Sequence, residues 1–206
     1  MQIQLIEAGK RFNFDWIFKN VEYSFDTQHS YAILGPNGSG KSTLMKVIAG
    51  HLTPSKGKVS FVKDEKNIDI DDVYKHISYA APYIELIEEF TLTEAIDFHA
   101  QFKPFLSDFS TKKIIEELGL GKSKDKQIRH FSSGMKQRLK LALAILSDTS
   151  VLLLDEPTTN LDAQGATWYR QLLSTHAKNR TVIIATNVEE DYLFMLPKVV
   201  NIFDYK

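Results

Sequence analysis

Residues 35–43 read Gly35-Pro36-Asn37-Gly38-Ser39-Gly40-Lys41-Ser42-Thr43, which is a glycine, four residues and then Gly-Lys-Ser/Thr. The apolar residues 31–34 before this loop predict a short buried strand. Residues 44–49 after it predict a helix with an apolar face that ends at Gly50. A loop of this pattern between a strand and a helix is typical of a phosphate-binding site, and it predicts an α/β core.

The glycines of this loop leave the backbone N–H groups free to point toward a bound anion. Gly35, Gly38 and Gly40 have no Cβ and tolerate positive φ, and the following helix adds its own unpaired N–H groups. We expect Lys41 to contact the β- and γ-phosphates of a nucleotide, and the Ser42 hydroxyl to bind Mg²⁺. The alternative, an ordinary glycine-rich turn, is disfavoured because the motif and its setting agree.

Composition narrows the class of protein. The chain has 206 residues, enough for one domain, and its 25 basic and 26 acidic side chains leave a net charge of −1, which predicts no nucleic-acid partner. Cysteine is absent, which excludes disulfides, zinc–thiolate sites and cysteine nucleophiles. No apolar run approaches the roughly 18 residues of a membrane span, and the first residues lack the basic start of a signal peptide. We expect a cytoplasmic chain that reaches a membrane only by docking to another protein.

An antiparallel β edge is predicted ahead of the phosphate loop. Residues 2–8 alternate polar and apolar side chains, and residues 16–25 predict a second and a third strand with a turn near Lys19 and Asn20. Phe12, Phe14 and Trp16 lie between these strands. An aromatic side chain here could stack on a purine or could belong to the core, and both readings stay open.

The middle of the chain changes from strands to helices. Residues 58–62 and 76–81 predict strands joined through a polar, hairpin-like connection at 63–67, and Pro82 ends the second strand. From residue 84 to about residue 118 the pattern is helical, with caps expected at Thr93 and Ser110 and a stop at Gly119. We therefore expect a helical subdomain at about residues 84–149 within a single domain, 1–206, whose core is formed by about residues 1–83 and 150–206.

The last third of the chain predicts a parallel sheet. A helix at 136–146 is expected to begin at the cap Ser132, and it is followed by a strand at 150–155, a helix at 163–176 and strands at 180–185 and 199–203. The predicted fold class is α/β: a P-loop NTPase core with a mostly parallel sheet, an N-terminal antiparallel edge and an inserted helical subdomain.

Two carboxylates follow the apolar strand at 150–155, at the edge where open α/β sheets bind ligands. Asp155 is expected to hold Mg²⁺ opposite Ser42, and Glu156 to orient or deprotonate the attacking water. A solvated strand end is the alternative. The phosphate loop earlier in the chain favours the catalytic interpretation.

The segment Phe131-Ser-Ser-Gly-Met-Lys-Gln-Arg138 resembles the signature motif of the ATP-binding-cassette family, and residues 159–162 stand where that family has its D-loop. The resemblance spans nearly the whole chain. It implies two cassettes paired head to tail, with ATP held between one chain's phosphate loop and the other's signature. It also implies that Phe12 stacks on adenine, and that Ser132, Gly134 and Asp162 contribute to nucleotide binding.

Several positions depart from the family pattern. Pro82 stands where a glutamine normally senses Mg²⁺ and water, and Asn187 replaces the histidine that contacts the γ-phosphate. Asn187 is still assigned a catalytic role, because its amide donates a hydrogen bond. In the signature, Ser133 replaces a glycine and Met135 a glutamine.

The resemblance implies the ATPase subunit of a transporter, which works with a separate membrane-spanning subunit as a homodimer or heterodimer of cassettes, peripheral at the inner face of the cell membrane. An apolar cluster between Tyr83 and Phe90 predicts the docking surface, although the same residues could instead pack the helical subdomain. The departures at Pro82 and Asn187 favour an alternative, a weakly hydrolysing switch or scaffold with a non-transport partner. A nucleic-acid cassette is disfavoured because no basic face is expected.

Overall fold

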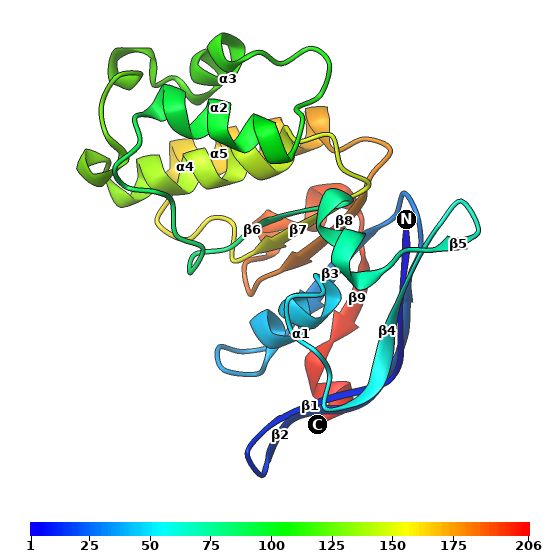
Figure 1. Ribbon diagram of the computed structural model, residues 1–206. Helices are drawn as coiled ribbons and strands as arrows, with labels where there is room; N and C mark the ends of the chain where they lie inside the picture. Colours follow the sequence, from blue (N-terminus) through cyan, green and yellow to red (C-terminus); the bar gives the residue numbers. More distant parts are fainter.

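The computed structural model describes residues 1–206, whose strands form two sheets (Figure 1). The first sheet is antiparallel and has the order β2-β1-β4-β5. Its strands are β1 (Gln2–Phe12), β2 (Asp15–Phe25), β4 (Lys56–Lys63) and β5 (Lys66–Asn67). The alternating apolar residues of β1 bury one face of this sheet, as the period of two predicts. The expected antiparallel edge is confirmed.

The second sheet is parallel throughout and has the order β6-β7-β8-β3-β9. Its strands are β3 (Ser30–Leu34), β6 (Ile77–Ala80), β7 (Val151–Asp155), β8 (Thr181–Ala185) and β9 (Lys198–Asn201). Every residue of β7 and β8 is buried, because both faces of this sheet are covered. The parallel arrangement brings the carboxyl ends of β3, β7 and β8 to one edge.

Helix α1 (Lys41–Ile48) lies between the two sheets, where it contacts β1 on one side and β7 and β8 on the other (Figure 1). Its apolar side chains share one core with both sheets; they are Leu44, Met45, Val47 and Ile48. The helix that follows the phosphate loop is therefore held at the centre of the molecule.

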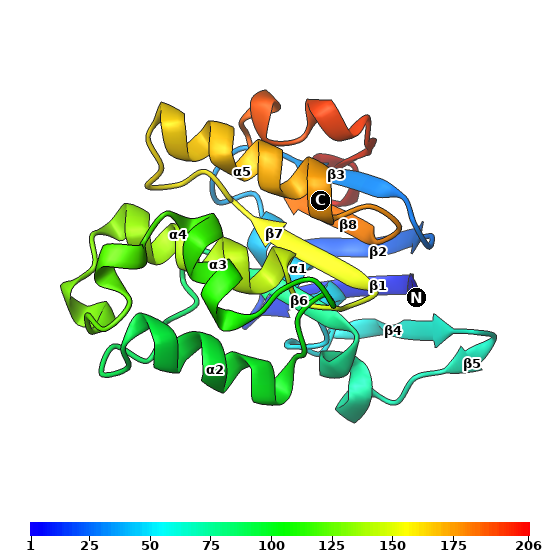
Figure 2. The same cartoon turned by 90° about the horizontal axis from the view of Figure 1, so that it is seen from above.

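The other helices lie toward the opposite face of the parallel sheet. Helix α4 (Ser133–Ile145) contacts β6 and β7 and lies beside α5 (Ala163–His176), and α3 (Thr111–Leu118) contacts both α4 and α2 (Leu92–Phe102), farther from the sheet (Figure 1). Helices α4 and α5 contact each other, and Figure 2 shows them from above with β7 between their ends. Their buried side chains form a second core with the sheet. Ser110 caps α3, which ends at Gly119 with φ +66°, as predicted.

Three local expectations are wrong. Residues 15–25 form one strand, because the turn falls at Asn13 (φ +53°), and Asn20 (φ +48°) accompanies an irregularity in the pairing of β1 with β2. The cap of α2 is Thr91, in a capping box with Glu94, and not Thr93.

Residues 84–90 are not helical either. The carbonyl of Phe90 accepts a hydrogen bond from the N–H of Ile128 (2.9 Å), and that of Glu88 accepts one from Arg129 (3.0 Å). The backbone of this segment thus pairs with a distant part of the chain.

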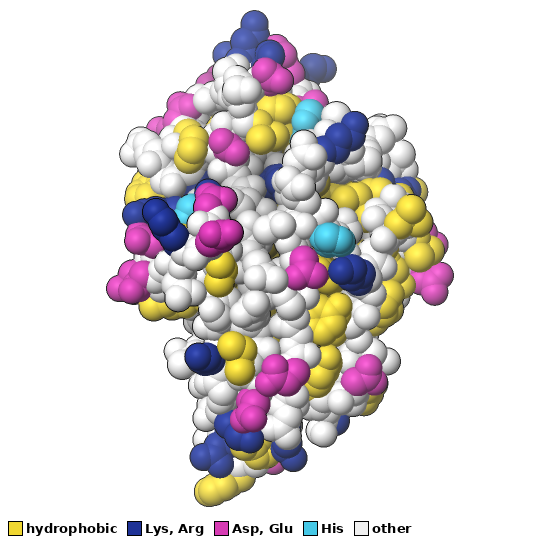
Figure 3. Space-filling model, turned by 90° about the vertical axis from the view of Figure 1, so that its right-hand side faces the viewer, with side chains coloured by type: hydrophobic (Ala, Val, Ile, Leu, Met, Phe, Trp, Pro, Cys, Tyr) yellow, Lys and Arg dark blue, Asp and Glu magenta, His cyan; other side chains and the backbone are white.

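No helix combines the length and the apolar character that a membrane crossing requires. On the face shown in Figure 3, basic and acidic side chains are interspersed, and hydrophobic side chains gather along one side.

Candidate functional site

The phosphate loop connects β3 to α1, as predicted. Gly40 has φ +105°, and a Cβ on it would come within 2.4 Å of the Ile17 side chain on β2. A larger residue is excluded on both grounds. The antiparallel sheet therefore packs directly on the loop and holds its backbone in place.

Lys41 is the point where the predicted catalytic residues meet. Its side chain is 5% exposed, and its Nζ donates to the Gly35 carbonyl at 2.7 Å. The same Nζ lies 3.2 Å from Glu156 Oε1 and 3.3 Å from Asn187 Oδ1. One ammonium thus joins the phosphate loop to the ends of β7 and β8. An ammonium in this position can exchange protein acceptors for phosphate oxygens.

Asp155 ends β7 and is fully buried. Burial raises the pKa of its carboxyl group, whereas the nearby hydroxyls of Ser42 and Tyr83 oppose that shift. The Tyr83 hydroxyl donates to Oδ2 at 3.1 Å, and Oδ1 is buried without a partner. A hydroxyl beside a carboxylate with an unpaired oxygen is an oxygen donor set that suits Mg²⁺. The residues present therefore fit the expected metal.

Glu156 and Asn187 both contact Lys41 of the phosphate loop. Glu156 has φ +45°, an uncommon conformation for a residue other than glycine, and its backbone N–H donates to the Ala185 carbonyl at 2.8 Å. Asn187 Nδ2 donates to Asn37 Oδ1 at 2.8 Å. A hollow of about 430 Å³ lies over the loop. Its lining residues are Ile17, Asn37, Gly38, Ser39, Gly40, Lys41, Ser42, Thr43, Glu156 and Thr159.

Besides Gly35, Pro36, Asp155 and Asn187, four residues expected at the nucleotide do not line this hollow. Phe12 lies near the β1–β2 turn, where its side chain is 49% exposed and Lys10 Nζ stands 5.3 Å from its ring. Ser132 caps α4, and Asp162 caps α5. Gly134 lies in the first turn of α4, where a Cβ would be 3.1 Å from the Asn160 carbonyl. Their roles in nucleotide binding stay predictions.

Four residues at the site are not assigned to it by the sequence pattern: Ile17 and Thr159, which line the hollow, and Lys206 and Tyr83. The Lys206 ammonium donates to the carbonyls of Ile17 (2.8 Å) and Ser39 (2.5 Å), and no local pattern indicates it. Tyr83 was expected only at a docking surface. Its second contact follows from the sheet order: β6 neighbours β7 in parallel, so a side chain just after β6 can reach the end of β7. Burial also raises the pKa of the Tyr83 phenol, which keeps it protonated.

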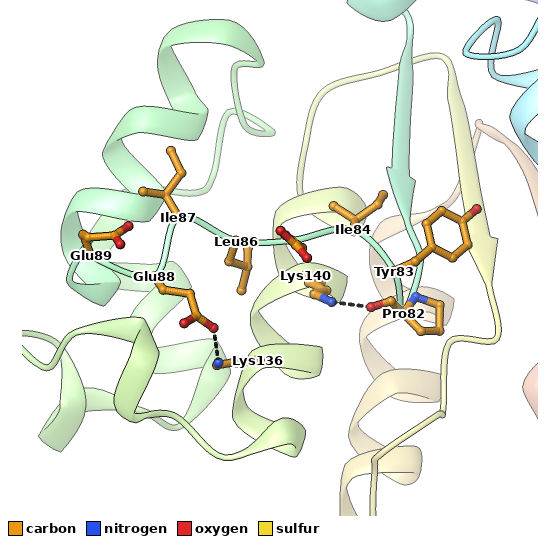
Figure 4. A pocket seen from close by; sticks show the side chains of 10 residues that line it. Pro82, Tyr83, Ile84, Leu86, Ile87, Glu88, Glu89, Lys136 and Lys140 are labelled. Carbon is orange, nitrogen blue, oxygen red and sulfur yellow. Dashed lines mark hydrogen bonds and ion pairs between the residues drawn. The ribbon is translucent and has the colours of Figure 1, made fainter.

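A second hollow, of about 730 Å³, lies between residues 82–89 and helix α4 (Figure 4). Lys140 Nζ donates to the Pro82 carbonyl at 2.8 Å, and Lys136 pairs with Glu88. The predicted apolar cluster is not fully buried, since Tyr83 is 42% and Ile87 44% exposed. We call this hollow the docking groove; its lining residues are Pro82, Tyr83, Ile84, Glu85, Leu86, Ile87, Glu88, Glu89, Lys136 and Lys140.

The sequence of this chain is similar to those of known proteins. Residues 18–159 match the model of a family described as ABC transporter. The ABC transporter ATP-binding protein YybJ of Bacillus subtilis is 28% identical over 192 residues, which are 93% of this chain and 88% of that protein. The Nod factor export ATP-binding protein I of Rhizobium johnstonii is 29% identical over 92% of this chain and 62% of its own length. The ABC transporter A family member 4 of Dictyostelium discoideum is 32% identical over 85% of this chain, which spans only 11% of that protein.

Solved structures share the fold. An ABC transporter ATP-binding protein from Pyrococcus furiosus superposes with a TM-score of 0.81 at 19% identity, over all of both chains. A dimeric ATP-binding cassette in a post-hydrolysis state, bound to ADP and Pi, also gives a TM-score of 0.81, at 22% identity, over 97% of this chain and 93% of its own.

Proposed function

This chain belongs to the ABC transporter family and is an ATPase of that family, and on this premise we propose that ATP-driven dimerisation lets it power a separate membrane-spanning subunit. The observation that carries the proposal is the meeting of Glu156 and Asn187 at the ammonium of Lys41. We propose further that the chain works at the inner face of the cell membrane, with a core of about residues 1–83 and 150–206 and a helical unit of about residues 84–149.

The residues of the site have different roles in ATP hydrolysis. Backbone N–H groups of the loop and Lys41 bind the phosphates, and the amide of Asn187 contacts the γ-phosphate. Ser42 and Asp155 would hold Mg²⁺, which when bound offsets negative charge on the phosphate oxygens. Glu156 orients the attacking water or accepts its proton, because its carboxylate lies in the hollow and is partly open to solvent.

Head-to-tail pairing of two cassettes is supported by predicted nucleotide-binding residues that do not line the hollow over the phosphate loop of their own chain. Ser132 and Gly134 stand at the N-terminal end of α4, whose dipole and free N–H groups attract anions. Neither residue lines the hollow of its own chain. In a dimer of two such chains, or of this chain and a different cassette, they would contact the nucleotide on the opposite phosphate loop, and Asp162 would face the interface.

Turnover tests the proposal. General-base and water-positioning groups contribute about 10²–10⁴-fold each, so a site with Pro82 and Asn187 in place of glutamine and histidine should hydrolyse ATP at well below the roughly 10 per second typical of enzymes. Asn187→His is expected to raise this rate with little change in ATP affinity, measured as steady-state ATPase at saturating ATP. A parent that already works at the typical rate and is indifferent to Asn187→Ala would remove Asn187 from the mechanism. A parent with no measurable turnover would favour the switch or scaffold.

Partner docking is assigned to the docking groove. Three glutamates and two lysines line the groove beside its exposed apolar side chains, and this small excess of negative charge suits a cytoplasmic segment of the membrane subunit that carries both apolar and basic residues. A photoreactive amino acid at Ile87 is expected to cross-link to a membrane protein in membranes of the source cell. The matched control is the same group at Phe14, which is 92% exposed at the β1–β2 turn. Equal labelling from both positions, or none from Ile87, would contradict this docking site.

A further inference from the structure

We infer that Tyr83, supported by Tyr79, is a positioning residue that orients the carboxylate of Asp155 for magnesium. The inference rests on the proposed function, because it concerns the metal that accompanies ATP. It assigns a role to a residue that the sequence pattern places in the docking groove alone.

Three elements place the Tyr83 hydroxyl at the metal site. Strands β6 and β7 pair in parallel with Ala80 beside Leu154, so the residues after β6 lie near the end of β7. The Tyr83 hydroxyl donates to Asp155 Oδ2 at 3.1 Å. Lys46 of α1 places its Nζ 4.1 Å from the centre of the Tyr83 ring.

Tyr79 also contacts the Tyr83 hydroxyl. Its own hydroxyl forms a hydrogen bond with that of Tyr83, and the two rings lie edge to face at 6.4 Å between centroids. Pro82 and the hydrogen bond from Lys140 to its carbonyl further restrict the backbone before Tyr83. The phenol is therefore fixed by its surroundings.

The contact has a consequence for metal binding. Tyr83 occupies Oδ2 of Asp155, whereas Oδ1 is buried with no partner. The hydrogen bond from the Tyr83 phenol to Oδ2 restricts rotation of the Asp155 carboxylate. Oδ1 is then left to bind Mg²⁺ or a water molecule on Mg²⁺. Hydrogen bonds to metal ligands of this kind typically contribute about 10–100-fold to metal affinity.

The test is Tyr83→Phe, which keeps the ring and removes the hydroxyl. Calorimetry would measure ATP affinity with Mg²⁺ and with EDTA. We expect the gain in affinity that Mg²⁺ provides to fall about tenfold in the variant, while affinity in EDTA stays at the parent value. Tyr79→Phe should give a smaller loss in the same direction, because Tyr83 keeps its own hydrogen bond to Asp155.

Tyr74→Phe is the matched control, because Tyr74 is 48% exposed and its hydroxyl forms no hydrogen bond to the site. It should leave both affinities unchanged. If Tyr83→Phe and the parent gain equally from Mg²⁺, Tyr83 does not position the carboxylate, and the proposed function stands. If the parent itself gains nothing from Mg²⁺, the magnesium site is wrong and this inference falls with it.

Discussion

Glu156→Gln is expected to hydrolyse ATP at least about a hundredfold more slowly than the parent while binding ATP with similar affinity. The carboxylate is 3.2 Å from Lys41 Nζ and lines the hollow over the phosphate loop. A glutamine keeps the shape and an acceptor oxygen for Lys41, but it cannot take a proton from water. Single-turnover hydrolysis and ATP calorimetry on the same preparation would separate the two effects.

Glu190→Gln is the control for this change, because Glu190 is exposed and lies outside the hollow. It should hydrolyse ATP at the parent rate. A Glu156→Gln chain with the parent rate would show that another group handles the attacking water.

Lys41→Ala is expected to weaken ATP binding by roughly tenfold to a hundredfold, because a hydrogen bond to a charged group contributes about 1.5–3 kcal/mol. The substitution also removes the donor shared by Gly35, Glu156 and Asn187. Calorimetry with Mg²⁺ and ATP gives the affinity.

Lys41 is buried, so a cavity could lower stability by itself. Lys41→Met preserves most of the volume and should show the same loss of affinity, whereas the exposed Lys112→Ala should show none. Parent-like affinity in both Lys41 variants would make its assignment to the phosphates wrong.

The fold follows from short-range patterns that the structure reproduces. The apolar residues before Gly35 form β3, the segment after it forms α1, and the fully apolar run up to Asp155 forms the buried strand β7. These elements could be predicted because burial on both faces of a parallel strand leaves a continuous apolar run. The cap at Ser132 could be predicted because capping is a local contact. In the structure the Ser132 side chain accepts a hydrogen bond from the N–H of Met135.

The predictions of secondary structure are wrong where pairing with a distant part of the chain determines the local structure. Residues 84–90 have a helical pattern, yet the carbonyls of Glu88 and Phe90 accept hydrogen bonds from Arg129 and Ile128. The continuous strand through Asn20 depends on its irregular pairing with β1.

The same limit applies to the site. Lys41, Glu156 and Asn187 were assigned from motifs, and the structure brings them together around one ammonium. The contact of Tyr83 with Asp155 depends on the order of strands in the sheet, which no local pattern contains. The roles proposed for Ser132 and Gly134 depend on a second chain.

The central claim is that ATP draws two of these cassettes together, and the mass of Glu156→Gln in solution tests it most directly. Light scattering after size exclusion would compare the variant with Mg²⁺ and ATP against the variant with Mg²⁺ and ADP. With ATP we predict a species of twice the 23.5 kDa chain mass, and with ADP a monomer. A variant that binds ATP in the calorimeter but remains monomeric with both nucleotides at high concentration would contradict the claim for two copies of this chain.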